Sequence, residues 1–274
     1  MTALTWNCEG IKNSIFTLKE ILTRDSPDLV FLSEPQIFQP DIATPMGLVD
    51  STYCYYLNSE DLHDCELALR KSRSFGGTLV LWKKCLDPYV TIHPVNTPAF
   101  TPLILQIPGY RHSIHIALYL PTSGKEQEFA AQLTNLRTCL DELAVLYPSA
   151  LVFIRGDGNF NQKNANRVVM FRHFLEHFSL SSVHIQHCTY HHFLGNGSYD
   201  SNIDVLLHSS EYGAIEQVVR IMCKLDYPTI LSHHDIILST FFIPAGAAVV
   251  SSGEIVTAPR LLNLRQKVFK TTKN

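Results

Sequence analysis

The stretch LVFIRGDGN, residues 151 to 159, places an apolar run of strand length directly before a glycine-rich aspartate and asparagine pair. In an extended backbone Asp157 and Asn159 can face the same way, and Gly156 and Gly158 allow a ligand to approach the main chain closely. We therefore expect a strand that ends in a functional carboxylate. Taken alone, the same residues suit an Asx-Gly turn before a helix about equally well.

Working outward, apolar runs of strand length recur along the chain: ALTW (3–6), LVFLS (29–33), TLVLW (78–82), IHIALYL (114–120), LVFIR (151–155), IDVLL (203–207) and DIILSTFF (235–242). Three segments between them, 14–25, 128–147 and 166–178, repeat apolar residues along one helical face. The first has Ser14 as its possible cap. Strands mixed with a few helices indicate an α/β or α+β layered domain.

Polar residues stand at the ends of these predicted strands, and four of the five clusters lie at carboxyl ends, where binding crevices of α/β sheets form. The clusters are Asn7 after ALTW, Glu34 after LVFLS, Tyr119 and Pro121 at the close of IHIALYL, Asp157 and Asn159 after LVFIR, and His233 and His234 before IILST.

Length and composition limit the class of protein. A chain of 274 residues, 46% apolar and 17% charged, can bury one large core, although its length also allows two domains. The longest near-apolar stretch, from Ile236 to Val250, contains Pro244 and Gly246 and is shorter than the ~20 residues of a membrane span. The N-terminus has neither a basic nor a continuous apolar region, so we expect no signal peptide. We expect a soluble protein.

Cysteine usage and charge add to this expectation. Seven cysteines without a CxxC pair favour reduced thiols in the cytosol or the nucleus. The net charge is −3, but the last fifteen residues hold five basic side chains and no acid, so the remainder is more acidic than the total suggests. An acidic body is compatible with a nucleic-acid partner, because a metal site itself needs clustered carboxylates.

Six motifs in order resemble the endonuclease/exonuclease/phosphatase superfamily: TWNCEG (5–10), LSEPQ (32–36), LYLPTSGK (118–125), RGDGNFN (155–161), SNIDVLL (201–207) and SHHDII (232–237). This resemblance implies an α/β fold, a four-layer α/β/β/α sandwich (DNase I-like) with two packed mixed β-sheets flanked by helices. It assigns residues 1–243 to this domain and leaves 244–274 as a basic C-terminal tail or linker.

Within the superfamily, the chain is most similar to the endonuclease domains of non-LTR (LINE-type) retrotransposons. SPDLVFLSEPQ and TYHHFLGNGSYDSNIDVLL carry this likeness. It implies nicking of double-stranded DNA to leave a 3′-hydroxyl for target-primed reverse transcription, and fusion to a reverse transcriptase. We expect a nuclear protein, or a cytoplasmic one before nuclear entry, that is neither secreted nor membrane-bound.

The resemblance also assigns roles to residues. Glu34 becomes the principal Mg²⁺ ligand, with Asn7 and Glu9 beside it. Asp157 activates the attacking water with help from Asn159. His234, held by Asp204, and Tyr119 contact the scissile phosphate. Each residue also has an ordinary structural interpretation: Asp204 as a strand-end cap, Tyr119 as a half-buried aromatic and Asn7 as a turn former.

One position departs from the family pattern. The family has Ser-Asp-His before the last strand, and aligning on Ser232 puts His234 on the family histidine and His233 in place of the aspartate. A neutral imidazole removes one negative charge, so Mg²⁺ binding should weaken or Mn²⁺ should be favoured. Asp235 cannot simply substitute, because it lies on the other side of His234 in the sequence.

The stretch HIQHCTYHHF, 184 to 193, gathers four histidines and a cysteine. We do not favour zinc, since no second half with paired cysteines exists in the sequence. By resemblance the stretch enters a hairpin that reaches a DNA groove, and the basic run RKSR is another candidate contact. The candidate DNA-binding residues are Tyr190, His191, His192, Asn196, Tyr199, Arg70, Lys71 and Arg73. Ordinary exposed side chains explain them about as well.

The favoured interpretation is therefore a metal-dependent DNA endonuclease. Two alternatives remain: a phosphoinositide or nucleotide phosphatase with the same core residues, and an inactive DNA-binding domain, which His233 motivates.

Overall fold

The computed structural model describes residues 1–49, 51–64, 66, 71, 74–160, 164–185, 188–194, 197–210 and 215–245, with backbone alone at 192–194, 197, 198 and 215. Arg70, Arg73, Asn196, and nearly all of the 244–274 tail therefore lie outside the described residues. None of the helices in the described part has both the length and the apolar character needed to cross a membrane.

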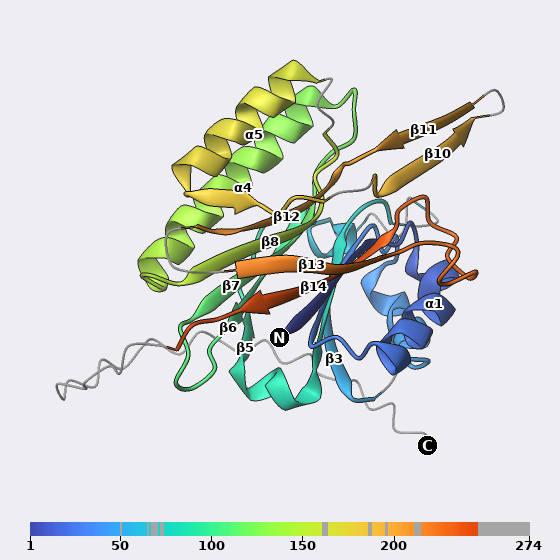
Figure 1. The fold of residues 1–274 in the computed structure, drawn as a ribbon, viewed down its shortest axis with the longest axis horizontal. Helices are drawn as coiled ribbons and strands as arrows, with labels where there is room; N and C mark the ends of the chain where they lie inside the picture. The colour runs from blue at the N-terminus through green and yellow to red at the C-terminus, as the bar shows by residue number, and fades with distance from the viewer. Residues whose placement is uncertain are drawn as a thin grey trace.

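Two six-stranded mixed sheets pack face to face (Figure 1). The first has the order β13-β14-β1-β2-β4-β3, formed by Ile215–Met222, Ile236–Phe242, Thr2–Asn7, Leu29–Ser33, Thr78–Lys83 and Tyr53–Asn58. The second has the order β5-β6-β7-β8-β12-β9, formed by Val90–Ile92, Phe100–Leu105, Ser113–Tyr119, Leu151–Asp157, Asp204–Ser209 and Leu180–Ser182. Only β1–β2 and β7–β8 pair in parallel among the described strands.

Helices cover the outer faces of the two sheets (Figure 1). α1 (Ile11–Arg24) packs on the first sheet, and α4 (Glu126–Leu146) and α5 (Ala165–His177) pack on the second. Shorter pieces are α2 (Ala43–Met46) and the 3₁₀ segments Gln39–Asp41, Glu60–Leu62 and Lys84–Tyr89. This arrangement confirms the predicted α/β/β/α sandwich.

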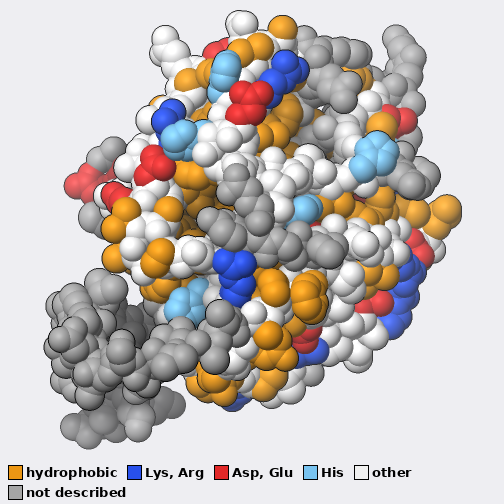
Figure 2. All heavy atoms as spheres, turned by 60° about the vertical axis from the view of Figure 1, so that its left-hand side comes forward, with side chains coloured by type: hydrophobic (Ala, Val, Ile, Leu, Met, Phe, Trp, Pro, Cys, Tyr) orange, Lys and Arg blue, Asp and Glu red, His pale blue; other side chains and the backbone are white. Residues whose placement is uncertain are grey.

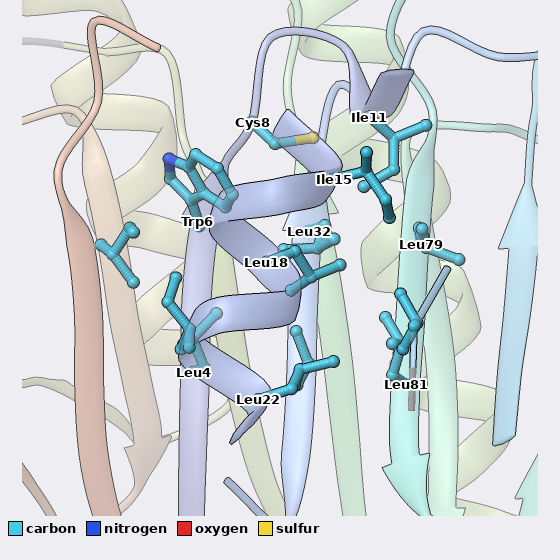
Figure 3. Close-up of a cluster of buried hydrophobic side chains, with 14 of the residues drawn as sticks. Leu4, Trp6, Cys8, Ile11, Ile15, Leu18, Leu22, Leu32, Leu79 and Leu81 are labelled. Carbon is cyan, nitrogen blue, oxygen red and sulfur yellow. The ribbon is translucent and has the colours of Figure 1, made fainter. Parts of the chain in front are cut away.

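The parallel pairs explain where the helices lie, because a crossover between parallel strands needs a connecting helix. α1 joins β1 to β2, and α4 connects β7 to β8. In Figure 3, Leu4 and Trp6 of β1 and Leu32 of β2 lie against Leu18 and Leu22 of α1. These side chains are at most 2% exposed, and truncating one such leucine typically costs ~2–5 kcal/mol.

The three predicted helices and seven predicted strands are all present, with small shifts at their ends. The predicted cap at Ser14 is wrong, because α1 begins at Ile11 after Gly10. Ser14 is buried in the first turn, and its hydroxyl donates to the carbonyl of Cys8 (2.7 Å). Strands β3, β5, β6, β9 and β13 were not among the apolar runs that the sequence singled out.

A charged network crosses the interface between the sheets. Arg155 of β8 and Glu216 of β13 are joined by a 2.7 Å ion pair, and both side chains are 0% exposed. The guanidinium also donates to Nδ1 of His115 (2.9 Å), so the other imidazole nitrogen carries the hydrogen that faces Ser113. Phe153 and Phe241 pack beside the guanidinium at about 5 Å from their ring centres.

Breaking this pair from one side should destabilise the fold strongly. Arg155→Met leaves the Glu216 carboxylate buried without a counter-charge, which typically costs ~3–5 kcal/mol. The double variant Arg155→Met/Glu216→Leu should recover much of that loss in urea denaturation. Lys12→Met, which removes an exposed pair with Asp41, should change stability by less than about 1 kcal/mol. A double variant as unstable as Arg155→Met would contradict the assignment of the loss to the orphaned charge.

Candidate active site

A cleft of about 310 Å³ opens where the carboxyl ends of β1, β2 and β8 meet the loop before β14. Six of the predicted catalytic and metal-binding residues line it: Asn7, Glu9, Glu34, Asp157, Asn159 and His234. They come from both sheets, so the cleft exists only because the sheets are packed together. The backbone of β8 is held close to β7 by Gly156, where a Cβ would lie 2.0 Å from the Leu118 carbonyl oxygen.

Asp157 is the most heavily bonded carboxylate in the cleft. One of its oxygens accepts from the side-chain amides of Asn7 (2.8 Å) and Asn159 (3.0 Å), and the other accepts from the Asn159 backbone (2.8 Å). Burial raises the pKa of Asp157 to about 7, against the opposing effect of His234. A carboxylate with this pKa can accept a proton efficiently near neutral pH.

His234 lies opposite Asp157, with its Nε2 3.9 Å from an Asp157 oxygen. Its Nδ1 faces both oxygens of Asp204, at 3.1 and 3.3 Å, and Asp204 also accepts from the Thr189 hydroxyl at 2.6 Å. Burial opposes protonation of His234, but the charge and hydrogen bond of Asp204 raise its pKa to about 9. The imidazolium is therefore favoured at neutral pH, with Nε2–H left for the cleft.

Three cleft residues have left-handed backbone: Glu9 (φ 45°), Glu34 (φ 51°) and Asn159 (φ 49°). This conformation costs glutamate about 1 kcal/mol or more relative to glycine and is common at functional sites. The Glu34 backbone N–H donates to the Gly77 carbonyl (3.1 Å), and its carboxylate accepts from the side chain of Gln36 (3.0 Å). These contacts hold the Glu34 side chain at the cleft.

The donors suit a hard divalent cation that keeps most of its waters. Glu34 and Glu9 supply carboxylate oxygens and Asn7 an amide oxygen, a sparse oxygen set of the kind that Mg²⁺ uses together with substrate phosphate. Within the described residues, no three acidic, histidine or cysteine side chains are grouped closely enough to hold a metal by themselves. The set thus fits a cation whose shell is completed by water and substrate.

His233 changes the surroundings of Glu9. The Glu9 carboxylate accepts from the His233 backbone (2.8 Å) and lies 3.0 Å from its Nδ1. The His233 imidazole thus contacts the Glu9 carboxylate, which the resemblance assigns to the metal. Asp235 does not compensate, because it is directed to His191 (3.1 Å) instead.

A two-stranded hairpin, β10 (Tyr190–Leu194) and β11 (Gly197–Ser201), projects from the body of the domain (Figure 1). At its base Tyr190 bridges to His234, and the ring centres of the two are 4.9 Å apart. Tyr190 and Tyr199 line the cleft, whereas His191 is held between Asp200 (2.9 Å) and Asp235. The side chain of His192 lies outside the described part.

Two predicted residues lie away from the main cleft. Tyr119 lines a neighbouring cleft, and burial, together with the nearby Glu34 carboxylate, raises the pKa of its hydroxyl. Lys71 pairs at 3.7 Å with Glu60, which lines that neighbouring cleft. On the face shown in Figure 2, lysine and arginine side chains are scattered among acidic and uncharged ones.

Sequence reasoning missed three residues that hold the site. Thr189 completes the hydrogen bonding of Asp204, and Ser33 joins the sheets by donating to the Leu118 carbonyl (2.8 Å) and accepting from the Asp157 backbone (3.3 Å). Arg167, fully buried, donates to the carbonyls of Pro121, Thr122 and Asn159, each at 2.7 Å. Two of them left a signal in the sequence, since Thr189 stands beside Tyr190 and Ser33 ends an apolar run of strand length. Arg167 left none, because in the sequence it is indistinguishable from an arginine on the surface of a helix.

Comparison with known proteins defines the fold class. No protein-family model and no curated protein matches the chain. Among solved structures, the AP endonuclease LMAP from Leishmania major has a TM-score of 0.67 at 14% identity, over 89% of this chain and 87% of that one. The chain therefore has the DNase I-like fold of the endonuclease/exonuclease/phosphatase superfamily.

Two further solved structures share this fold. The endonuclease domain of TRAS1, a telomere-specific non-LTR retrotransposon, has a TM-score of 0.62 at 11% identity, over 90% of this chain and 99% of that domain. The 3′ phosphatase NExo from Neisseria, bound to a product DNA hairpin, has a TM-score of 0.63 at 14% identity, over 88% and 99%. At these identities the comparison concerns the fold.

The Asp204–His234 pair should be visible in a titration. NMR should give His234 a pKa of about 9, above its ordinary 6.5, and Asp204→Asn should lower it. Because the folded-state pKa is raised, the pair stabilises the fold below pH 6.5 and loses this contribution as pH rises through 9. Glu176→Gln, beside the exposed His173, should leave the His234 titration unchanged. A His234 pKa at or below 6.5 would refute the assignment.

Proposed function

We propose that this protein is a divalent-metal-dependent phosphodiester hydrolase that nicks DNA and leaves a 3′-hydroxyl. The proposal rests on Asp157 and His234, which face each other 3.9 Å apart in one cleft. Burial raises the pKa of Asp157, so this carboxylate can act as a base, and Asp204 raises the pKa of His234, so its imidazolium can act as a donor. Hydrolytic sites typically hold two titratable groups whose surroundings shift their pKa values so that one acts as a base and the other as a proton donor.

Each residue has a task in this reaction. Asp157 accepts the proton of the attacking water, and Asn7 and Asn159 orient its carboxylate. His234 donates Nε2–H to a non-bridging phosphate oxygen while Asp204 holds its other nitrogen. Glu34, with Asn7 and Glu9, would hold Mg²⁺ or Mn²⁺, which when bound neutralises charge on the phosphate and the leaving oxygen. Tyr119, whose pKa is raised further by burial and by Glu34, adds a protonated hydroxyl near Glu34.

DNA as the substrate is supported by two of the similar structures, which are an AP endonuclease and the endonuclease domain of a retrotransposon. We infer that residues 1–243 form the nuclease domain, that the basic stretch after it leads to a reverse transcriptase, and that the protein works in the nucleus on double-stranded DNA. The projecting hairpin, with Tyr190 and Tyr199 at the cleft, is the proposed DNA-contacting arm.

A phosphatase activity is the second candidate, because one similar structure is a 3′ phosphatase and the same core residues serve both reactions. An inactive DNA-binding domain is the third, because His233 engages the carboxylate of Glu9.

Nicking of supercoiled plasmid with Mg²⁺ or Mn²⁺ tests the proposal. Wild type should convert plasmid to the open circle, and His234→Ala and Asp157→Asn should each lower the rate by roughly 10²–10⁴-fold, because the proton donor or acceptor is lost. The matched control His173→Ala removes a histidine from the exposed face of α5 and should nick like wild type.

The outcomes separate the three candidates. Release of phosphate from a 3′-phosphorylated oligonucleotide or a phosphoinositide without nicking would favour the phosphatase. Turnover of neither substrate with either metal, alongside retained DNA binding, would leave the inactive domain.

The role of His233 has its own test. His233→Asp should restore a carboxylate near Glu9, so half-maximal nicking should need less Mg²⁺ than in wild type, by several-fold. His233→Asn, which removes the imidazole without adding charge, is the control and should show a smaller gain. An unchanged metal requirement in His233→Asp would mean that the imidazole does not attenuate the site.

A further inference from the structure

Asp235 has no task in the reaction proposed above, although it follows His234 directly and its side chain is only 11% exposed. Burial raises the pKa of the Asp235 carboxyl, the hydrogen bond from His191 opposes this rise, and the Asp204 carboxylate adds to it. A carboxylate in such surroundings is costly unless it is paired. The structure pairs it with the imidazole of His191, whose Nε2 lies 3.1 Å from an Asp235 oxygen.

The loop before β14 lies beside β10 and is joined to it through the backbone. The His191 N–H donates to the His233 carbonyl at 2.8 Å. The Asp235 N–H donates to the Thr189 carbonyl at 2.7 Å, so the two bonds flank the bridge between Tyr190 and the histidine of this loop. The base of the hairpin is therefore attached to the same loop that carries the proposed phosphate-binding imidazole.

The His191 imidazole adds a side-chain link to this backbone attachment. Its Nδ1 lies 2.9 Å from Asp200, which stands directly opposite on β11, and its Nε2 faces Asp235. Ionised carboxylates accept but do not donate, so the ring can donate to both only as an imidazolium. Burial opposes this protonation, but the two carboxylates raise the pKa of His191. One charged ring thus ties both strands of the hairpin to the loop.

The side chain of His191 lies on the face of the hairpin that is turned away from the cleft. Tyr190 and Tyr199 line the cleft, and side chains alternate along a strand, so the residues that follow them, His191 and Asp200, lie on the opposite face. The sequence suggested that His191 contacts DNA directly. Its place in the fold favours an effect that acts through the two tyrosines.

We propose that His191 is a positioning residue, which through Asp235 holds the hairpin in the orientation in which Tyr190 and Tyr199 meet DNA beside His234. The inference rests on the proposed function and concerns how its DNA-contacting arm is held. Without this contact the arm would be ordered only when DNA binds, and the entropy lost at that moment would lower the affinity. The chemical step itself would be little affected.

Binding of a duplex oligonucleotide without divalent metal tests the inference separately from hydrolysis. Asp235→Ala removes a negative charge near a polyanion, which by electrostatics alone should strengthen binding. The proposal predicts the opposite sign. Asp235→Ala and His191→Ala should each weaken binding by roughly 3- to 20-fold, because each breaks the same partly buried contact. In the double variant the two losses should not add.

Two further readouts distinguish positioning of the arm from a general structural role. If wild type nicks DNA, His191→Ala should raise KM by a factor similar to its loss of binding and keep kcat within about twofold. In the DNA-free protein, the Asp235 amide hydrogen should exchange with solvent at least about fivefold faster in His191→Ala than in wild type, because the base of the hairpin opens more readily.

His177→Ala is the matched control. His177 is similarly exposed (40% against 34% for His191) and likewise lies close to a carboxylate, that of Asp141 at 3.3 Å, but it joins α5 to α4. Thermal unfolding of each variant verifies that it is folded, and His177→Ala should bind and nick DNA like wild type.

Three results would overturn the inference. Tighter DNA binding by Asp235→Ala would mean that this carboxylate acts only by repulsion, and additive losses in the double variant would mean that His191 contacts DNA itself. Unchanged exchange of the Asp235 amide in His191→Ala would show that the contact does not hold the hairpin. A protein that never nicks but shows the predicted, non-additive losses of DNA binding would lose the proposed hydrolysis and keep the positioning role.

Discussion

The buried ion pair between Arg155 and Glu216 is the constraint that fixes the two sheets relative to each other. Each sheet contributes one charge, and neither is exposed to solvent, so any sliding of the sheets would leave a charge without a partner in a low-dielectric interior. Asp157 follows Arg155 by two residues on the same face of β8. The position of this carboxylate, the proposed base, is thereby tied to the register of the whole sandwich.

The site is assembled from two halves that have little function apart. The first sheet and its adjoining loops supply Glu9, Glu34 and His234, and the second supplies Asp157 and Asp204. Hydrogen bonds cross the boundary from Asn7 to Asp157 and from His234 to Asp204. Because these charged groups lie close together and mostly buried, each shifts the pKa of its neighbours. The packing of the two sheets therefore brings the pKa values of the site into the range needed for proton transfer near neutral pH.

The sequence predicted the layered fold and most of the cleft, because apolar runs and the polar residues that end them are local signals. It failed where the cause is distant along the chain. The predicted cap at Ser14 was wrong, because the Ser14 hydroxyl donates to the carbonyl of Cys8 instead of capping the helix. Arg167 was missed because the carbonyls to which it donates lie up to 46 residues away in the sequence. His233 was recognised as unusual, but only the fold shows that it engages Glu9.

The left-handed backbone at Glu9, Glu34 and Asn159 has a consequence for how this protein can evolve. Glycine at these positions would relieve conformational strain, so the same substitutions that make the chain more robust would delete the groups proposed to act in catalysis and metal binding. Stability and activity are thus opposed at three identified positions. Descendants of this domain that lose their chemistry and keep only a binding role would be free to drift toward glycine there, which offers a sequence marker of abandoned catalysis.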